Sequence, residues 1–295
     1  MTLAGKTFAV LGADGFIGQA LCRHLRGQGA ELRAFGRSDT DYFAQPLGHA
    51  IYCIGLTMDY QSRPFDTVEA HVALFARLLK DAAFESMTYL SSTRLYDSGT
   101  GIGSEEESLT LSPHNPLHLY DFSKGLGEVL CLTAGRGNVR TARLGYVYSD
   151  DLSADNFLHN LLRDTANNRA LNIDSHPRMA CDYVHMDDVC LALTAIALSG
   201  RRQIYNVASG RNTANSDLFA LIERLTGCAI TTTVASDTCC PRSPKIDISA
   251  LVEDFAIRPR KLEKALSAIL GTHGHDTPKT ASAQSPQADI AKRAS

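Results

Sequence analysis

Tyr120 and Lys124 stand four residues apart in the segment HLYDFSKGLGEVL, a spacing that can build an acid/base pair. Residues at i and i+4 share one face of a helix, so the spacing predicts that the two side chains are neighbours. A fixed ammonium favours the phenolate and lowers the pKa of a nearby tyrosine from its reference of about 10. Tyr120 is therefore a candidate to exchange a proton with a substrate hydroxyl near neutral pH. A solvated surface pair has the same spacing, so this hypothesis depends on the motifs that accompany it.

A glycine-rich loop near the start of the chain predicts a dinucleotide site. The segment VLGADGFIGQALCRHL places Gly12, Gly15 and Gly18 directly after an apolar strand pattern and at the start of an amphipathic helix. The first glycine of such a loop makes the tight turn, the second lets the backbone approach a pyrophosphate, and the third lets the helix pack close to the sheet. The N–H groups at the start of the helix attract phosphate. A glycine-rich turn without a ligand is the alternative, and the order strand, loop, helix favours the dinucleotide.

The end of the second predicted strand, 31–35, favours NADP over NAD. An acidic side chain at this place bonds the ribose hydroxyls of NAD, whereas an arginine accommodates the 2′-phosphate of NADP. The segment LRAFGRSD offers Gly36, Arg37 and Ser38 here, with no acid before Asp39. Because a guanidinium binds phosphate with forked, charge-assisted hydrogen bonds, we predict that Arg37 contacts NADP. NAD is the alternative if Arg37 is only a solvated loop residue.

The order of apolar patterns predicts the fold. Helical patterns, among them 66–83 and 120–134, alternate with short apolar runs that are typical of buried strands. This alternation predicts an α/β protein with a Rossmann-type, doubly wound parallel sheet. The predicted strands are residues 6–11, 31–35, 50–54, 87–91, 139–147 and 204–208.

The chain is expected to divide into a core, a smaller lobe and a tail. The dinucleotide-binding core is predicted at 1–148 and 187–210, and the substrate-binding lobe at 149–186 and 211–270, where the patterns are less regular. From 271 to 295 the chain is mostly Ala, Ser, Thr, Gln and Pro. Such a segment buries too little apolar surface to fold, so we predict a disordered tail.

The composition describes an ordinary globular protein and argues against several classes of function. With 44% hydrophobic residues, 21% charged residues and a net charge of −3, the 295-residue chain has no basic face for nucleic acid. No apolar run approaches the length of a membrane span, and the first residues have no secretory leader pattern. Most of the eight cysteines fall in predicted strands and helices as small core residues. We therefore expect a cytoplasmic protein.

Several charged residues invite a functional interpretation that we do not favour. His185, Asp187 and Asp188 could suggest a metal site, but we expect one aspartate to cap the following helix and His185 to pack beneath it. The acids at 105–107 are interpreted as a solvated loop, and Arg143, on a predicted strand, as a structural residue. No metal site is predicted.

Several motifs in order resemble the extended short-chain dehydrogenase/reductase family of the NAD-dependent epimerase/dehydratase type. GADGFIG resembles that family's glycine loop, SSTRLYD its serine/threonine motif, and the pair Tyr120 and Lys124 its YxxxK motif. TARLGYVYSD, CDYVHMDDVCLAL, IYNVASG and RPRKLEKAL resemble its later segments, so the resemblance spans roughly residues 4 to 270. The serine/threonine motif ends a predicted strand, where an open α/β sheet faces its ligand crevice.

The resemblance implies a role for each matching residue. Tyr120 would be the acid/base, Lys124 would hold the nicotinamide ribose and tune Tyr120, and Ser92 would orient the reacting oxygen. The three loop glycines, with Phe16 and Ile17 between them, would line the pyrophosphate. The resemblance also implies a sugar substrate that is linked to a nucleotide, and a homodimer formed through two long helices that include 120–134.

Departures from the family pattern narrow the function. Dehydratases of the family carry an acid where this chain has Arg94, so a 4,6-dehydratase is disfavoured. The interval between 31–35 and Ala50 is too short for another strand and helix, so the unit that usually carries an adenine-binding aspartate is expected to be missing. His71 stands where the family often has asparagine, and Cys181 stands where many relatives have an arginine that grips a nucleotide diphosphate.

Five residues are the predicted substrate contacts. Arg178 or Arg242 is expected to supply the charge that Cys181 cannot, and Asn156 matches an early asparagine of the family's substrate lobe. The full set is Thr93, Arg94, Asn156, Arg178 and Arg242. The alternative for Asn156, Arg178 and Arg242 is that each is an ordinary surface residue.

The sequence thus favours an NAD(P)-dependent oxidoreductase that acts on a sugar carbon as an epimerase or a ketoreductase. An epimerase re-reduces its own keto intermediate and retains the cofactor, whereas a reductase releases the oxidised cofactor in each turnover. The alternative is a catalytically silent cofactor-binding sensor of the same fold. A hydrolase that uses Ser92 is disfavoured because no Gly-x-Ser-x-Gly elbow surrounds that serine.

Overall fold

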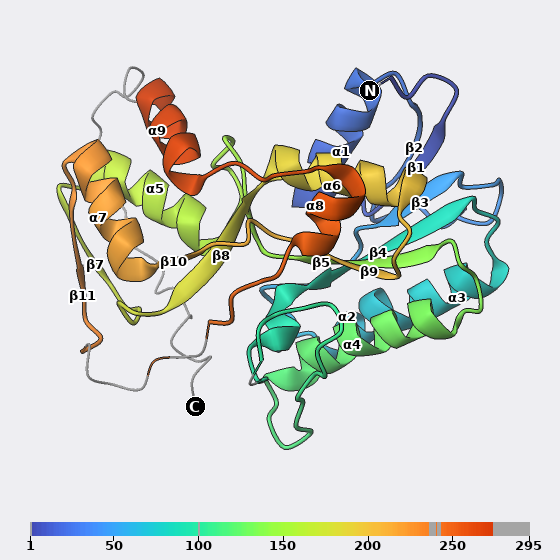
Figure 1. Cartoon of the computed structure of the whole chain (residues 1–295), viewed down its shortest axis with the longest axis horizontal. Coiled ribbons are helices and arrows are strands. Elements are labelled where there is room, and N and C mark those ends of the chain that lie inside the picture. The colour runs from blue at the N-terminus through green and yellow to red at the C-terminus, as the bar shows by residue number, and fades with distance from the viewer. Residues whose placement is uncertain (1, 100, 236–239, 241–242, 274–295) are drawn as a thin grey trace.

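The core of the protein is a parallel sheet with helices on both faces. The computed structural model describes residues 2–99, 101–235, 240 and 243–273. In this part of the chain, a six-stranded sheet has the order β2-β1-β3-β4-β5-β9, and all its pairings are parallel (Figure 1). Its strands are β1 (Thr7–Leu11), β2 (Glu31–Phe35), β3 (His49–Tyr52), β4 (Ser86–Ser92), β5 (Val139–Leu144) and β9 (Ile204–Val207). The predicted doubly wound α/β fold is confirmed.

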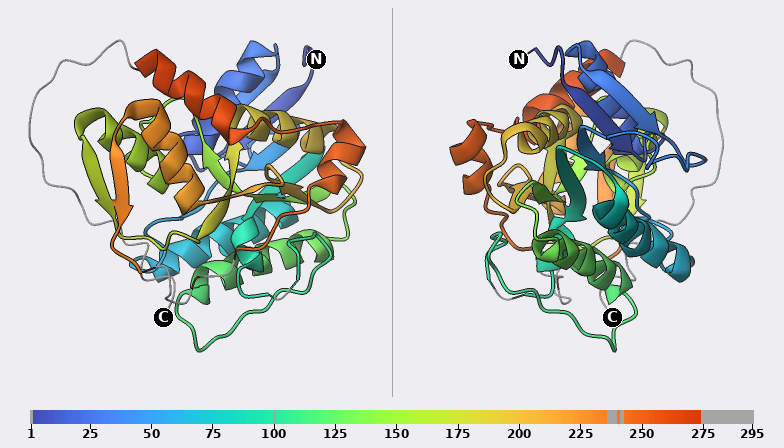
Figure 2. Two further views of the ribbon diagram at one scale, coloured as in Figure 1. Left: turned by 60° about the vertical axis from the view of Figure 1, so that its left-hand side comes forward. Right: turned by 90° about the vertical axis from the view of Figure 1, so that its right-hand side faces the viewer.

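The two faces of this sheet are covered by different helices. In β1, Phe8 and Val10 belong to one hydrophobic cluster, and Ala9 and Leu11 belong to another, because successive side chains of a strand point to opposite faces. Burial of both faces explains why the strands are apolar throughout rather than alternating. One face packs on α1 (Phe16–Gly27), α6 (Met186–Ser199) and α8 (Ser249–Phe255). The other packs on α3 (Leu74–Asp81) and α4 (His118–Thr133), and α2 (Pro64–Val68) lies beside α4 on this side (Figure 1; Figure 2).

The long helix predicted at 66–83 contains a π-helical turn, η1 (Glu69–Ala73), between α2 and α3. Two buried tyrosines of the sheet bond carbonyls of this turn. The Tyr52 hydroxyl donates to the Ala70 carbonyl at 2.6 Å, and the Tyr89 hydroxyl donates to the His71 carbonyl at 3.0 Å. A π-turn inside a helix often marks a functional position, and this one carries His71.

The chain between β2 and β3 contains no further strand or helix, as its short length predicted. β2 is the edge strand, and β3 pairs with β1 on its other side. The chain therefore adds β2 on one side of β1 and β3 on the other, so the strand order changes direction at β1. In an open α/β sheet, ligands bind at this switch point, in the crevice beyond the carboxyl ends of the strands. The glycine loop follows β1 directly and lies at this crevice.

The predicted strand 139–147 is in fact two strands in two sheets. β5 ends at Leu144, and β6 (Tyr146–Tyr148) joins a second sheet of order β10-β8-β6, with β8 (Ala180–His185) and β10 (Asn212–Ala214). Gly145 makes the transition. Its N–H still donates to Val207 of the first sheet at 3.0 Å, but a Cβ there would lie 2.9 Å from the Asp182 carbonyl oxygen of the second.

The smaller lobe is built around this second sheet. It adds a two-stranded sheet, β7 (Ala170–Ile173) with β11 (Ala229–Thr232), and three helices. The helices are α5 (Phe157–Asn167), α7 (Asn215–Thr226) and α9 (Leu262–His273). α9 is held by Leu266 and Ile269, which are buried in the lobe's hydrophobic cluster. It continues to residue 273, so the tail predicted from 271 begins too early; residues 274–295 lie outside the described part of the chain.

Candidate active site

Tyr120 and Lys124 lie on one side of α4, as their spacing predicts, and both are buried. Tyr120 is 6% exposed and Lys124 is 5% exposed. The Lys124 Nζ atom lies 5.9 Å from the centre of the Tyr120 ring and donates to the Leu90 carbonyl oxygen of β4 at 2.9 Å. The pair therefore faces the carboxyl end of β4 and is not a solvated surface pair.

Burial changes the charge of Lys124. Loss of hydration disfavours the ammonium and lowers the pKa of Lys124 to about 7. Near neutral pH both charge states of the free protein are therefore populated. The electrostatic influence of Lys124 on Tyr120 depends on pH, a property that the four-residue spacing alone does not reveal.

His71 completes the surroundings of Tyr120. Its ring lies edge-on to the Tyr120 ring, with 5.4 Å between their centres, and burial lowers the pKa of His71 to about 2, so the ring is neutral. Nε2 accepts the Leu56 N–H at 3.1 Å, so Nδ1 carries the proton and donates to the Ser123 hydroxyl at 2.7 Å. The departure from asparagine was visible in the sequence, but this contact with Tyr120 was not.

The hydroxyl groups that follow β4 differ in their contacts. Ser92 precedes the 3₁₀ turn η2 (Thr93–Tyr96), and its Oγ accepts the Arg94 N–H at 3.2 Å. This contact uses a lone pair, so the Ser92 O–H is still able to donate. The Thr93 hydroxyl is buried and donates to the Leu144 carbonyl oxygen at 3.3 Å. Thr93 thus has a structural role, because its hydroxyl holds the turn η2 against the end of β5.

Arg94 is built into the wall around Tyr120. Its guanidinium carbon lies 5.1 Å from the centre of the Tyr120 ring and 5.2 Å from that of Tyr60, within the range of cation–π contacts. Nε pairs with Asp121 at 3.1 Å, and Nη2 donates to the Leu117 carbonyl oxygen at 3.0 Å. The position that carries an acid in dehydratases therefore holds a fixed positive charge.

The glycine loop forms a cradle that fits a pyrophosphate. Gly12 has a φ of +90°, which favours glycine, and a Cβ at Gly18 would lie 2.1 Å from the Gly12 carbonyl oxygen. Gly15 is the N-cap of α1, and no side chain of a described residue bonds the first N–H groups of this helix. These donors follow directly at Phe16 and Ile17 and suit an anionic ligand. Arg37 lies exposed after β2, where an adenosine ribose is expected.

A cavity of about 370 Å³ separates the core from the lobe beside this site. Thr93, Arg94 and Asp121 line it from the core, and Tyr146 and Asp182 line it from the second sheet. Tyr120 does not line the cavity itself, but Arg94 both lines it and covers the Tyr120 ring. The cavity also has polar lining residues that sequence reasoning missed: Asn115, His118 and Asn212.

The structure does not bring all predicted substrate contacts to this cavity. Asn156 caps α5, since its Oδ1 accepts the His159 N–H at 2.9 Å. Arg178 is exposed and is not a lining residue, although its neighbour Met179 is. Arg242 lies outside the described residues. Of the five predicted contacts, Thr93 and Arg94 are therefore those that line the cavity.

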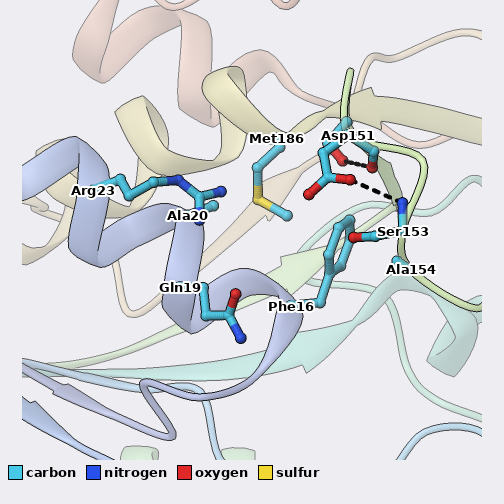
Figure 3. Close-up of a pocket in the computed structure, with 9 residues that line it drawn as sticks. Phe16, Gln19, Ala20, Arg23, Asp151, Ser153, Ala154 and Met186 are labelled. Atoms are coloured by element: carbon cyan, nitrogen blue, oxygen red, sulfur yellow. Dashed lines mark hydrogen bonds between the residues drawn. The ribbon is translucent and has the colours of Figure 1, made fainter.

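A second cavity of about 140 Å³ lies between α1 and the segment after β6 (Figure 3). Phe16 and Arg23 of α1 approach it from one side, and Asp151 and Ser153 approach from the other. The Asp151 carboxylate accepts the Ser153 N–H at 2.9 Å, which holds the turn. The segment after β6 thus stands directly opposite the first turn of α1.

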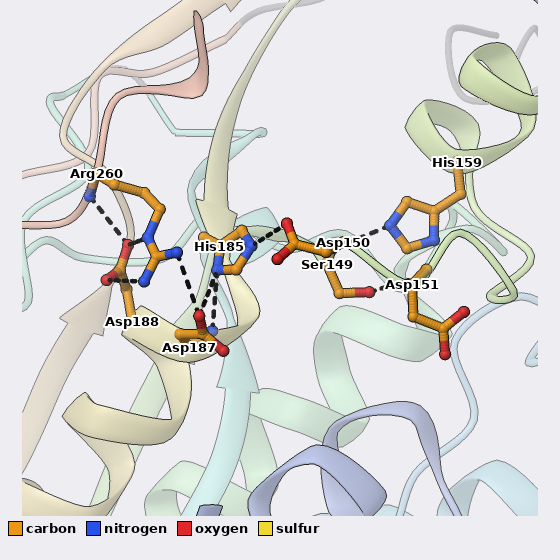
Figure 4. A network of polar contacts seen from close by, with 8 residues as sticks. All are labelled: Ser149, Asp150, Asp151, His159, His185, Asp187, Asp188 and Arg260. Carbon is orange, nitrogen blue, oxygen red and sulfur yellow. Dashed lines mark hydrogen bonds and ion pairs between the residues drawn. The ribbon is translucent and has the colours of Figure 1, made fainter. Parts of the chain in front are cut away.

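A polar network anchors the same segment to α6 (Figure 4). The expected capping of α6 by an aspartate is wrong: His185 is the N-cap, and its Nδ1 accepts the Asp187 N–H at 3.1 Å. β8 runs straight into α6, so the buried His185 ring is already at the helix start, whereas Asp188 accepts the Arg260 N–H at 2.9 Å. His185 Nε2 also lies 3.0 Å from Asp150. Among the described residues, no group of His, Cys, Asp and Glu is arranged to hold a metal ion.

Arg143 forms a buried ion pair between β5 and α4, in agreement with a structural role. Its Nε and Nη2 bond the two Glu128 carboxylate oxygens at 2.9 and 2.6 Å. The solvated-loop interpretation is wrong for Glu105, because its Oε1 accepts the Asn206 N–H at 2.9 Å and burial raises the pKa of its carboxyl group. The bond to Asn206 of the distant strand β9 thus explains why Glu105 is not a solvated loop residue.

Comparison with known proteins identifies the family. A model of the NAD dependent epimerase/dehydratase family matches residues 8–208, from β1 to the end of β9, and includes Ser92, Tyr120 and Lys124. The chain belongs to this family. Its members are epimerases, dehydratases and reductases that use a nicotinamide cofactor, so the resemblance seen in the motifs is confirmed.

Three similar proteins are each 20–22% identical to this chain. A dTDP-4-dehydro-6-deoxy-D-allose reductase from a Streptomyces species is 22% identical over 268 residues, covering 76% of this chain and 82% of the reductase. The structure of MoeE5 with UDP-glucose and NAD has a TM-score of 0.75 at 21% identity, over 91% of this chain and 98% of that one. RMD from Pseudomonas aeruginosa, complexed with NADPH, has a TM-score of 0.73 at 20% identity, over 90% and 98%.

Proposed function

We propose that this protein is an NAD(P)-dependent oxidoreductase of the sugar epimerase or ketoreductase type, with Tyr120 as its acid/base. The observation that carries the proposal is the enclosure of Tyr120. The phenol is buried against Lys124, His71 and Arg94, at the carboxyl end of β4 and beside the cavity. A tyrosine that served only as packing would need neither a dehydrated ammonium nor a fixed guanidinium next to its ring.

Each residue has a defined task in this proposal. Tyr120 gives a proton to the reacting oxygen of the sugar, or takes one from it, and the Ser92 O–H orients that oxygen. The Lys124 ammonium binds the nicotinamide ribose and influences Tyr120, while the glycine loop and the start of α1 hold the pyrophosphate. The bound nicotinamide supplies or accepts the hydride.

The proposed substrate is a sugar that carries a nucleotide. Proteins with which this chain shares its fold include one solved with UDP-glucose and another with UDP-glucuronic acid, and the reductase relative acts on a dTDP-sugar. Amide, imidazole and carboxylate groups line the cavity at Asn115, His118 and Asp182, and such groups suit sugar hydroxyls. Of the predicted substrate contacts, Thr93 and Arg94 line this cavity. Roles for Asn156, Arg178 and Arg242 stay predictions.

The fixed charge at Arg94 supports the exclusion of 4,6-dehydratase chemistry. Removal of water from a sugar needs a carboxyl group that can hold and return a proton, whereas a guanidinium keeps its charge at every relevant pH. Arg94 is moreover held in a largely buried ion pair with Asp121, which any movement of the guanidinium would break.

A turnover assay tests the proposed function and separates its two forms. The purified chain would be incubated with UDP- and dTDP-linked sugars and the oxidised cofactor NAD or NADP, and with the corresponding keto sugars and NADH or NADPH. A reductase consumes one reduced cofactor for each alcohol formed, which the loss of nicotinamide absorbance measures. An epimerase interconverts the sugars, as seen by NMR, without a net change in cofactor. Dinucleotide binding without any sugar conversion would instead favour the silent sensor.

A homodimer formed through α4 is the proposed assembly. Phe122, Leu126 and Val129 lie at i, i+4 and i+7 along α4 and are 40–49% exposed, so they form one apolar stripe. α2 packs beside α4 and exposes Phe65 to 86%. Contact with the same face of a second copy would cover both helices, as the family resemblance implies.

Light scattering after size-exclusion chromatography tests this assembly. The double variant Leu126→Lys/Val129→Lys should convert a dimer into a species near the 31.9 kDa of one chain, because it places two charges in the apolar stripe. Leu191→Lys is the control, since Leu191 is 47% exposed on α6, away from α4. A wild-type protein that runs as a monomer would refute the proposal.

A cytoplasmic location also stays a prediction. The cysteines in the described part of the chain are all free thiols, which a reducing compartment would maintain. None of the described helices is both long enough and apolar enough to cross a membrane.

A further inference from the structure

The glycine loop delivers a carboxylate to the end of β2. The N–H groups of Gly12 and Ala13 both donate to the Phe35 carbonyl oxygen, at 2.8 and 2.9 Å. These bonds tie the loop to the last residue of β2, although the two segments are more than twenty residues apart in sequence. As a result Asp14, the next residue of the loop, lies beside Gly36 and Arg37.

The Asp14 carboxylate is seated against the backbone that follows β2. Its Oδ2 accepts the Arg37 N–H at 3.0 Å, and a Cβ at Gly36 would lie only 2.3 Å from the same oxygen. Glycine at position 36 is thus the residue that leaves room for this carboxylate. The Gly36 N–H is also occupied, because it donates to Asp39 Oδ2 at 2.6 Å.

This arrangement has consequences for the ribose of a bound dinucleotide. The place after β2 is where a Rossmann fold reads the 2′ position of the adenosine ribose. Here the two backbone N–H groups that could hold a 2′-phosphate are already bonded to carboxylates, and both carboxylates would repel that phosphate. A ribose 2′-hydroxyl, in contrast, is a donor, and the exposed Asp14 carboxylate has further lone pairs to accept it.

We propose that Asp14 selects NAD over NADP, as the ribose-binding carboxylate that β2 itself does not supply. The proposal rests on the dinucleotide site of the proposed function and opposes the preference for NADP that Arg37 suggested. Among the described residues, the Arg37 guanidinium has no ion-pair partner, and only its backbone N–H takes part in the contact with Asp14. An acid inside the glycine motif was a readable sequence signal, but its approach to β2 was not.

Binding measurements on the full chain test this assignment. Dissociation constants for NADH and NADPH come from the change in the fluorescence of the reduced nicotinamide on binding. The wild-type protein should bind NADH at least about tenfold more tightly than NADPH. Asp14→Asn, which removes the charge and keeps the shape, should narrow this ratio by about tenfold, mainly through tighter NADPH binding. Asp14→Ser provides a second, smaller replacement.

Two controls make the result specific. Asp41→Asn removes one charge from an exposed residue of the same segment and should leave the ratio unchanged. Arg37→Ala should lower the affinity for NADPH and NADH to a similar, small extent. A wild-type preference for NADPH that Arg37→Ala abolishes, or an unchanged ratio in both Asp14 variants, would overturn the assignment.

These binding measurements, combined with the turnover assay, separate this assignment from the proposed function. Selective NADH binding without conversion of any sugar would leave the role of Asp14 standing and refute the proposed catalysis. Failure to bind either dinucleotide would overturn both.

Discussion

Replacing Tyr120 with phenylalanine should lower the turnover number by about 10²- to 10⁴-fold, the usual contribution of a general acid or base. The substitution removes one hydroxyl group and keeps the ring that His71, Lys124 and Arg94 contact. Dissociation constants for the dinucleotide should therefore change little. Steady-state kinetics on the sugar that the turnover assay identifies, combined with the binding titration, measure both quantities.

A second tyrosine provides the matched control for this experiment. Tyr148 is 1% exposed in the lobe, and its buried hydroxyl has no hydrogen-bond partner among the described residues. Tyr148→Phe should therefore retain nearly full turnover. If Tyr120→Phe retained turnover as well, proton transfer would have to be assigned to another group, and the proposed mechanism would fail.

Replacing Glu128 with glutamine should destabilise the protein by about 3–5 kcal/mol, because it breaks a buried ion pair from one side. The side chains of Arg143 and Glu128 are only 3% and 4% exposed, so a neutral amide would leave a guanidinium dehydrated and without its counter-charge. The remaining hydrogen bonds of Arg143, to the Tyr96 hydroxyl at 2.5 Å and the Glu105 carbonyl oxygen at 3.4 Å, go to neutral groups and cannot replace the carboxylate. Urea unfolding followed by circular dichroism gives the change in the free energy of unfolding.

An exposed pair of the same chemistry shows whether burial is the cause. Arg224 and Glu263 lie 2.8 Å apart, but their side chains are 64% and 65% exposed. Glu263→Gln should therefore cost no more than about 1 kcal/mol. The double variant Glu128→Gln/Arg143→Met should recover much of the lost stability, since it removes the unpaired charge. Equal losses in Glu128→Gln and Glu263→Gln would contradict this explanation.

Local patterns in the sequence were sufficient for the framework of the site. The i, i+4 spacing put Tyr120 and Lys124 on one side of a helix, because helical geometry depends only on neighbouring residues. The glycine spacing predicted the turn after β1 for a similar reason. The short interval after β2 predicted the missing strand, because a crossover has a minimum length. These properties follow from backbone geometry within one or two elements.

The chemistry of the site was decided by packing between distant segments. The pKa of Lys124 depends on its dehydration by β4 and neighbouring segments, which the periodicity of its own helix cannot predict. His71 reaches Tyr120 from another helix, and Asp14 reaches the end of β2 from the glycine loop. The passage of the chain from the first sheet to the second at Gly145 likewise depends on two distant residues, Val207 of the first sheet and Asp182 of the second. The sequence by itself determined most strands and helices of the core and their order; the tertiary structure decided where they break and what they contact, because desolvation and side-chain contacts arise only when separate elements meet.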